Sequence, residues 1–223
     1  MKSVLIIGLG RFGRHLCEKL SQLGNEVMIV DHNEAAVAEM ANSVTSAKIC
    51  DCTDENALRA LGVHHFDICF VCIGSDFASS LLITSMLKDL GAKRIVAKAS
   101  ADMHMRLLLR NGADEVIYPE RDSAERMAIR TSASHVFDYI ELTDEHAIYE
   151  IPPLANWIGK TILELDIRNK YHINILAVKT GDTLRPLPGA NYLFTGAEHI
   201  LALAAQEDAR RLLKKVENNS PIV

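Results

Sequence analysis

The sequence has 223 residues, of which 48% are hydrophobic and 24% are charged, and this balance excludes disordered and fibrous proteins. The formal net charge is −5, and the 24 lysine and arginine residues are spread along the chain, so no strong basic field is available to bind nucleic acid. No uncharged stretch approaches the roughly 20 apolar residues of a membrane helix, and no signal-peptide pattern precedes the first strand-like segment, so we expect a cytoplasmic protein that inserts no segment into a membrane.

Short β-branched segments alternate with helical windows over the first half of the chain. We predict strands near 3–7, 26–30, 45–50, 67–72, 94–98 and 114–118. We predict helices between them near 11–23, 33–42, 54–61, 77–89 and 102–111. Almost continuously apolar strands are typical of a parallel sheet that is covered on both faces. This order predicts an α/β fold with a doubly wound, parallel, Rossmann-like sheet.

Residues that favour helix ends mark these boundaries. A glycine follows four of the predicted helices, at Gly24, Gly62, Gly91 and Gly112. We expect these glycines to adopt the left-handed conformation that ends many helices. A side chain able to accept a hydrogen bond from a first-turn N–H stands where three helices begin, at Asn33, Asp54 and Asp102. We therefore predict these three residues to be N-caps.

The pattern changes after Pro119. Residues 121–136 form one helical window with no parallel strand behind it, and short strands and turns follow, with helices near 160–170 and 206–217. This predicts a second, smaller α+β domain. We therefore divide the chain into a nucleotide-binding domain, a crossover helix and a C-terminal subdomain, at 1–118, 119–138 and 139–217.

A glycine-rich loop follows the first strand, with the sequence Gly8-Leu9-Gly10-Arg11-Phe12-Gly13. Gly8 permits the tight turn, Gly10 lets backbone N–H groups approach a diphosphate, and Gly13 lets the helix pack closely. Asp31, which ends the second strand, can accept from both hydroxyls of an adenosine ribose. His32 follows it in place of an arginine, which disfavours NADP. The motif predicts an adenine nucleotide but leaves ATP, ADP and NAD as alternatives.

Other polar residues also follow predicted strands and are expected at the same edge of the sheet. Arg11 is permanently charged and could pair with a terminal phosphate or with an acidic group of a neighbouring subunit, although a solvated arginine explains it too. The remaining residues of this edge are Asp51, Cys52, Thr53, Ile73, Gly74, Ser75, Asp76, Lys98, Pro119, Glu120, Arg121 and Asp122.

At these residues the sequence resembles a known family. The segments IIGLGRFG, ICDCTDENAL, VCIGSD, IVAKA and GADEVIYPERDSAERMA are similar to the cytosolic regulators of bacterial potassium uptake. These are the KtrA and TrkA proteins, which are built on the RCK (regulator of conductance of K⁺) module. The resemblance covers nearly the whole chain, with an RCK N-terminal domain and a TrkA-C domain. The length favours the single-RCK, KtrA-like form over the duplicated TrkA form.

The resemblance implies a regulatory ring of eight subunits, arranged as dimers, on the cytoplasmic face of a potassium-translocating membrane subunit of the KtrB or TrkH type. ATP and ADP, or NAD(H), would switch this ring. By the same resemblance, Arg11 reaches the γ-phosphate across a dimer, and Asp51 and Cys52 contact the adenine. Glu120 would help to hold a divalent or monovalent cation beside the phosphates. The nucleotide-binding residues that we predict are Gly8, Gly10, Arg11, Phe12, Gly13, Asp31, His32, Asp51, Cys52, Ile73, Gly74, Ser75, Lys98 and Glu120.

The C-terminal segment LELDIRNKYHINILAV is similar to the one with which some KtrA-like proteins bind cyclic di-AMP. By this resemblance, Arg168 would bind a phosphate and Asn174 a base edge. Ile173 stands where one such family pattern has histidine. A structural arginine–asparagine pair explains the same two residues.

A zinc site and an enzymatic function receive less support from the sequence. Cys50 and Cys52, with Cys69 and Cys72, superficially suggest zinc, but strand alternation sends the last two to opposite faces, so we expect free core thiols.

An NAD-dependent oxidoreductase is the alternative function, because the glycine loop fits it equally well. The histidines of the C-terminal part, His146, His172 and His199, form no pair whose spacing marks a catalytic role, so we expect no enzyme.

Overall fold

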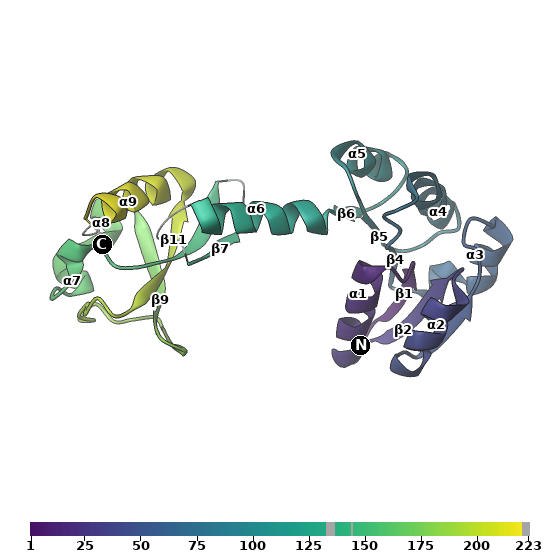
Figure 1. Cartoon of the computed structure of the whole chain (residues 1–223), viewed down its shortest axis with the longest axis horizontal. Helices are drawn as coiled ribbons and strands as arrows, with labels where there is room; N and C mark the ends of the chain where they lie inside the picture. The colour runs from purple at the N-terminus through teal and green to yellow at the C-terminus, as the bar shows by residue number, and fades with distance from the viewer. Residues whose placement is uncertain (133–136, 144, 220–223) are drawn as a thin grey trace. The chain divides into compact units, whose positions relative to one another are not determined.

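The protein is described by a computed structural model that covers residues 1–132, 137–143 and 145–219 (Figure 1). The chain divides into two compact units, an N-terminal unit (Met1–Arg121) and a C-terminal unit (Asp122–Val223). The finer division at residues 118, 138 and 217 stays a prediction. None of the described helices has the length and apolar content needed to span a membrane.

A six-stranded parallel sheet forms the N-terminal unit, with the strand order β3-β2-β1-β4-β5-β6. Its strands are β1 (Ser3–Ile7), β2 (Glu26–Asp31), β3 (Ser46–Ile49), β4 (Ile68–Val71), β5 (Ile95–Lys98) and β6 (Glu115–Ile117). The helices between them are α1 (Arg11–Gln22), α2 (Glu34–Met40), α3 (Glu55–Leu61), α4 (Phe77–Asp89) and α5 (Asp102–Arg110). This order confirms the predicted doubly wound sheet, and its direction reverses between β1 and β4.

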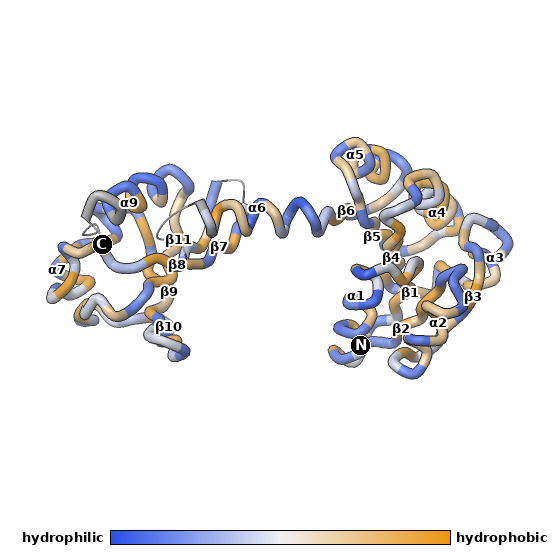
Figure 2. The backbone as a smooth tube through the Cα atoms, viewed as in Figure 1, coloured by the Kyte–Doolittle hydropathy of each residue, from blue (hydrophilic) through white to orange (hydrophobic). Residues whose placement is uncertain are grey.

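Both faces of this sheet are covered. One core cluster joins the sheet to α1 and α2 through residues such as Cys17 and Val37. The other joins it to α3, α4 and α5 through residues such as Leu58, Ile83 and Leu108. Figure 2 shows the hydrophobic residues along β1 and β5 that this double burial requires.

Most of the predicted helix ends are confirmed. Gly24, Gly62, Gly91 and Gly112 all have positive φ angles. Asn33 and Asp54 cap α2 and α3 by accepting from backbone N–H groups. The prediction for Asp102 was wrong, because Ala101 is the extended N-cap residue and Asp102, the first residue of α5, instead accepts from Arg121 at 3.3 Å. Asp76 caps α4, which we did not predict as a cap.

Helix α6 (Pro119–Ser132) follows β6. The predicted helical window over 121–136 is therefore helical as far as Ser132, and residues 133–136 lie outside the described residues. Asp138, at the end of the predicted segment 119–138, is the first residue of β7 and pairs with Glu150.

The C-terminal unit is a five-stranded antiparallel sheet with the strand order β10-β9-β11-β8-β7. Its strands are β7 (Asp138–Glu141), β8 (His146–Ile151), β9 (Ile173–Thr180), β10 (Thr183–Pro186) and β11 (His199–Ala205). Its helices are α7 (Ile162–Leu165), α8 (Ile167–Tyr171) and α9 (Gln206–Asn219). The predicted helix near 160–170 is two short helices, because Asp166 between them has a left-handed φ of 48°. Trp157 and Phe194 are fully buried in the core.

Candidate functional site

The glycine loop lies at the reversal point of the parallel sheet, directly after β1. Gly8 has a φ of +98°, and its N–H donates to the carbonyl of Val30 in β2 over 2.9 Å. A left-handed residue with a Cβ would be strained there. The loop therefore continues from β1 and is anchored to β2 at the carboxyl edge of the sheet.

The three glycines of the loop differ in the space around them. A Cβ at Gly13 would lie 2.1 Å from the carbonyl oxygen of Gly8, and one at Gly8 would lie 3.0 Å from Cγ1 of Ile73. At Gly13 a Cβ would force the backbone to shift, whereas at Gly8 it would press on the Ile73 side chain and strain the left-handed backbone. At Gly10 no described atom beyond its chain neighbours comes within 4 Å of that position, so open space adjoins the backbone. This is the geometry that a diphosphate cradle requires.

Helix α1 begins at this open position. Among the described residues no side chain caps its N-terminal N–H groups, and its first turn contains Arg11 and Arg14 but no acidic residue. Arg11 is exposed, Phe12 is partly buried, and Arg14 donates to the carbonyl of Leu9 over 2.9 Å. A helix N-terminus with this charge pattern stabilises an anion. The residues present therefore fit the phosphates of a nucleotide.

Asp31 stands one strand away, where the sequence predicts the ribose contact. Its Oδ2 accepts from the N–H of Leu9 over 2.6 Å, and its Oδ1 accepts from the N–H of Asn33 over 2.8 Å. His32 is exposed, with Nδ1 3.4 Å from Oδ1 of Asp31. The bond to Leu9 is a feature that we did not predict. It gives Asp31 a second role, which is to hold the glycine loop against β2.

Asp51 and Cys52, the predicted adenine contacts, differ in exposure. Asp51 is exposed and accepts from the N–H and Oγ1 of Thr53 over 2.9 and 2.7 Å, bonds that lower the pKa of the carboxyl. Cys52 is only 5% exposed, and burial raises the pKa of its thiol. A contact between Cys52 and a ligand would therefore use the backbone of this residue.

The loops after β4 and β5 bring further predicted residues to this edge. Ile73 and Gly74 are partly buried and Ser75 is exposed. Lys98 donates from Nζ to Oε1 of Glu120 over 2.7 Å. This hydrogen bond lowers the pKa of the Glu120 carboxyl more than any other contact does, and the positive charge of Arg11 lowers it further. Within the described parts of the chain, no group of three His, Cys, Asp or Glu side chains is placed to hold a metal ion.

The two predicted ligand residues of the C-terminal unit are in contact. Arg168, in α8, donates from Nε to Oδ1 of Asn174, in β9, over 2.8 Å, and both side chains are exposed. The structure thus brings this pair together. A structural pair and a ligand-binding pair would both have this geometry.

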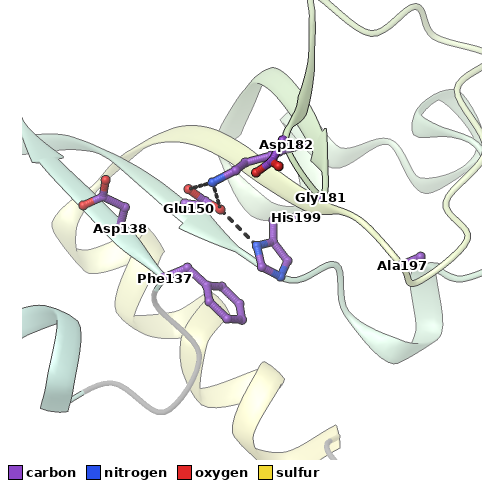
Figure 3. A pocket seen from close by; sticks show the side chains of 8 residues that line it. Phe137, Asp138, Glu150, Gly181, Asp182, Ala197 and His199 are labelled. Carbon is purple, nitrogen blue, oxygen red and sulfur yellow. Dashed lines mark hydrogen bonds and ion pairs between the residues drawn. The ribbon is translucent and has the colours of Figure 1, made fainter.

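A charged pocket of about 510 Å³ in the C-terminal unit was not predicted (Figure 3). Glu150 lies at its centre, and its Oε1 is 2.9 Å from Nζ of Lys179 and 3.0 Å from Nδ1 of His199. The ring of Phe137 stacks on that of His199, with centroids 3.7 Å apart. Although burial opposes ionisation, the bonds from His199 and Lys179 outweigh it and lower the pKa of Glu150. Glu150, Lys179 and His199 therefore bind one another, and Asp138 and Asp182 also line the pocket.

The cysteines show no zinc arrangement among the described residues. All five are free thiols. Cys69 belongs to the core on one face of the sheet and Cys72 to the core on the other, as strand alternation predicts. Burial raises the pKa of each of these two thiols to about 12, so both are neutral.

Comparison with known proteins assigns the chain to a family. The TrkA-N domain family matches residues 4–119, and the TrkA-C domain family matches residues 146–217. The chain is 40% identical to the Ktr system potassium uptake protein C of Bacillus subtilis (strain 168) over 215 residues, which are 96% of this chain and 97% of that protein. It belongs to the Ktr/TrkA family of potassium uptake proteins. This confirms the resemblance seen in the sequence.

Another relative and two solved structures support the same assignment. The Ktr system potassium uptake protein A of the same bacterium is 35% identical over 94% of this chain and 95% of its own length. The GsuK RCK domain has a TM-score of 0.71 at 19% identity, with 98% of this chain and 48% of that chain covered. The GsuK channel bound to NAD has a TM-score of 0.69 at 20% identity, with 98% and 39% covered. At these identities the structures confirm the RCK fold.

The Ktr/TrkA chain thus carries most of its predicted site residues at one edge of one sheet. Sequence motifs located the glycine loop, and the rule that strands end at a common edge located Lys98 and Glu120. Neither signal indicated that Lys98 and Glu120 bind each other, or that Asp31 binds Leu9. Opposite charge at the ends of β5 and β6 was the available signal for the first of these contacts.

Proposed function

We propose that this chain is the nucleotide-binding regulatory subunit of a bacterial potassium uptake system and not an enzyme. The proposal rests on two observations taken together, the match to a Ktr protein and the geometry of the glycine loop. The chain matches a Ktr potassium uptake protein over nearly its full length, and its glycine loop leaves open space at Gly10 beside an uncapped helix N-terminus.

ATP and ADP, or NAD(H), are the proposed ligands of the N-terminal unit. Asp31 would accept from the ribose, backbone N–H groups of the glycine loop would donate to the diphosphate, and Arg11 would reach a terminal phosphate. The relative named as the GsuK channel has been solved bound to NAD, and GsuK has also been solved bound to ADP. Those structures support the ligand class, and the cation proposed beside Glu120 follows from the family resemblance.

Regulation requires two states of the protein with different ligand affinities. We propose that dimers of the chain assemble into an eight-subunit ring on the cytoplasmic face of a potassium-translocating membrane subunit. A ligand that prefers one state of the ring by about 1.4 kcal/mol shifts the ratio of the two states tenfold. Arg11 provides such a difference if it meets a γ-phosphate in one state alone.

A second ligand, cyclic di-AMP, is proposed for the C-terminal unit. The bond between Arg168 and Asn174 uses Nε of the guanidinium, and an arginine has four further N–H donors for a phosphate. The exposure of both side chains supports this proposal.

Potassium flux through the reconstituted complex tests the main proposal. The full chain would be combined with its membrane subunit in vesicles, and K⁺ uptake would be compared with saturating ATP and with saturating ADP. We expect higher flux with ATP. Equal flux with both nucleotides, with binding of both verified, would reject nucleotide gating.

Two cheaper measurements separate regulation from catalysis. A thermal-shift panel with ATP, ADP, NAD, NADH and cyclic di-AMP identifies the ligands, because a ligand at 100 times its Kd adds about 2.7 kcal/mol of stability. Hydride transfer from NADH to candidate acceptors is expected to be absent. Catalytic turnover by the purified chain would favour the oxidoreductase instead.

A further inference from the structure

One ion pair lies at the edge of the candidate phosphate site. Lys98 is the last residue of β5, and Glu120 is in the first turn of α6. Their charged atoms are 2.7 Å apart. The Lys98 side chain is only 12% exposed, whereas that of Glu120 is 56% exposed. The ammonium is therefore held inside the site, and the carboxylate is at its surface.

The absence of a side chain at Gly74 makes room for this ammonium. A Cβ at Gly74 would lie 3.1 Å from Nζ of Lys98 and 3.9 Å from its Cδ and Cε. Gly74 belongs to the loop after β4, and β4 pairs with β1, the strand that leads into Gly8. Lys98 thus lies next to the point where the strand order reverses, which is where doubly wound sheets bind phosphates.

The charges around Glu120 indicate what could replace it. Lys98 and Arg11 both favour its ionised form, so Glu120 is an anion beside two cations at neutral pH. A nucleotide phosphate is also an anion that accepts charge-assisted hydrogen bonds from lysine and arginine. Glu120 and a phosphate oxygen are therefore alternative acceptors for Lys98.

We propose that Glu120 is an internal competitor of the nucleotide: Lys98 pairs with Glu120 in the nucleotide-free protein and exchanges this carboxylate for a phosphate oxygen on binding. The inference rests on the proposed function, because it concerns the same site. The exchange also frees the Glu120 carboxylate for a cation.

The exchange would reach α6. Two further contacts join the segment after β5 to the segment after β6: Tyr118 donates from Oη to the carbonyl of Ser100 over 2.9 Å, and Arg121 donates to Asp102 over 3.3 Å. The Lys98–Glu120 pair is a further contact of this kind, and it lies beside Gly74. Loss of this pair removes one of the contacts that attach the start of α6.

Calorimetric titration of ADP into the full chain tests the exchange, in buffer with EDTA so that no divalent cation takes part. We expect Glu120→Gln to bind ADP about 3-fold to 10-fold more tightly than wild type, because the competing carboxylate is gone. Lys98→Met is expected to bind at least about 10-fold more weakly. The double variant is expected to bind as weakly as Lys98→Met, since Glu120 then has no Lys98 to occupy.

Glu115→Gln is the matched control. Glu115 pairs with Arg94 over 2.5 Å near the opposite, amino end of β5 and β6, so its removal is expected to leave ADP affinity unchanged. Unchanged or weaker binding by Glu120→Gln would overturn the proposal, as would wild-type affinity in Lys98→Met. An equal gain from Glu120→Gln with and without Lys98 would show simple repulsion and also overturn it. Failure of wild type to bind ADP would instead refute the proposed function on which the inference depends.

Discussion

In the N-terminal unit, open space adjoins the backbone at the carboxyl edge of the sheet, whereas in the C-terminal unit the polar groups at the centre of the pocket bind one another. Beyond its chain neighbours, no described atom lies within 4 Å of the position that a Cβ of Gly10 would take. Helix α1 begins next to this open position and has no side-chain cap. Glu150, by contrast, is bonded to both Lys179 and His199. Buried polar groups need partners in either case. The comparison teaches that a ligand can complete the first region, while Glu150 at the centre of the second already has its partners within the protein.

The largest expected effect is that of Gly13→Ala on the N-terminal unit. The new Cβ would lie 2.1 Å from a backbone oxygen, so the strand or helix must shift, at a cost of about 3 kcal/mol. Urea unfolding followed by circular dichroism should show this loss. The only tryptophan, Trp157, lies in the C-terminal unit, and its fluorescence transition should be unchanged.

Gly10→Ala is the control for this substitution. A Cβ at Gly10 meets no described atom within 4 Å, so the free energy of unfolding should stay within about 1 kcal/mol of wild type. Equal destabilisation by the two substitutions would contradict the close packing at Gly13.

Asp31→Ala comes next, with a loss of about 1–3 kcal/mol of ADP binding free energy in calorimetry. The substitution removes the predicted ribose acceptor and the bond that holds Leu9. Asp67→Ala is the control, because Asp67 likewise accepts from a backbone N–H, that of Ser3 over 2.9 Å, but at the amino end of the sheet. A similar loss of ADP affinity in both variants would place Asp31 outside the nucleotide site.

Glu150→Gln tests the C-terminal unit of this comparison. Loss of the ionised acceptor should cost about 1–2 kcal/mol, seen by Trp157 fluorescence, without change in ADP affinity. Because the pKa of Glu150 is lowered by folding, the unfolded state binds this proton more readily. Its contribution is therefore present above the ordinary pKa of 4.5 and is lost as the pH falls below it. The stability of the variant should fall less than that of wild type in this acid range, and parallel pH profiles would contradict this assignment.

The smallest expected effect on stability is that of Arg168→Ala. The pair with Asn174 is exposed, so the free energy of unfolding should change by no more than about 0.5 kcal/mol. Cyclic di-AMP binding should be abolished and ADP binding preserved, both measured by calorimetry. Retained cyclic di-AMP binding would leave Arg168 and Asn174 as a structural pair, and loss of both ligands would indicate misfolding.

The two units also differ in how far sequence predicts them. The glycine loop is contiguous, and its neighbours follow from the order of parallel strands, so the fold and the location of the candidate site could be predicted. The hydrogen bond that Lys98 donates to Glu120 and the one that Asp31 accepts from Leu9 depend on side-chain direction, which strand order does not define. Asp102 was assigned as a cap because its type favours that role, but the helix begins one residue earlier than this requires.

The Glu150 pocket shows why the rest could not be predicted. Its three bonded groups, Glu150, Lys179 and His199, come from β8, β9 and β11. Their contact depends on register: His199 pairs with Lys179, and Leu201 pairs with Glu150. Shifting one strand by one residue would turn these side chains to the other face. The spacing of these three residues along the sequence does not indicate that they meet.

A crystal structure of the full chain grown with ADP tests the central claim most directly. The account predicts the diphosphate against the backbone at Gly10 and the start of α1, with the ribose hydroxyls at the Asp31 carboxylate. Solvent alone at this loop in an intact protein, or ADP bound at another place, would contradict it.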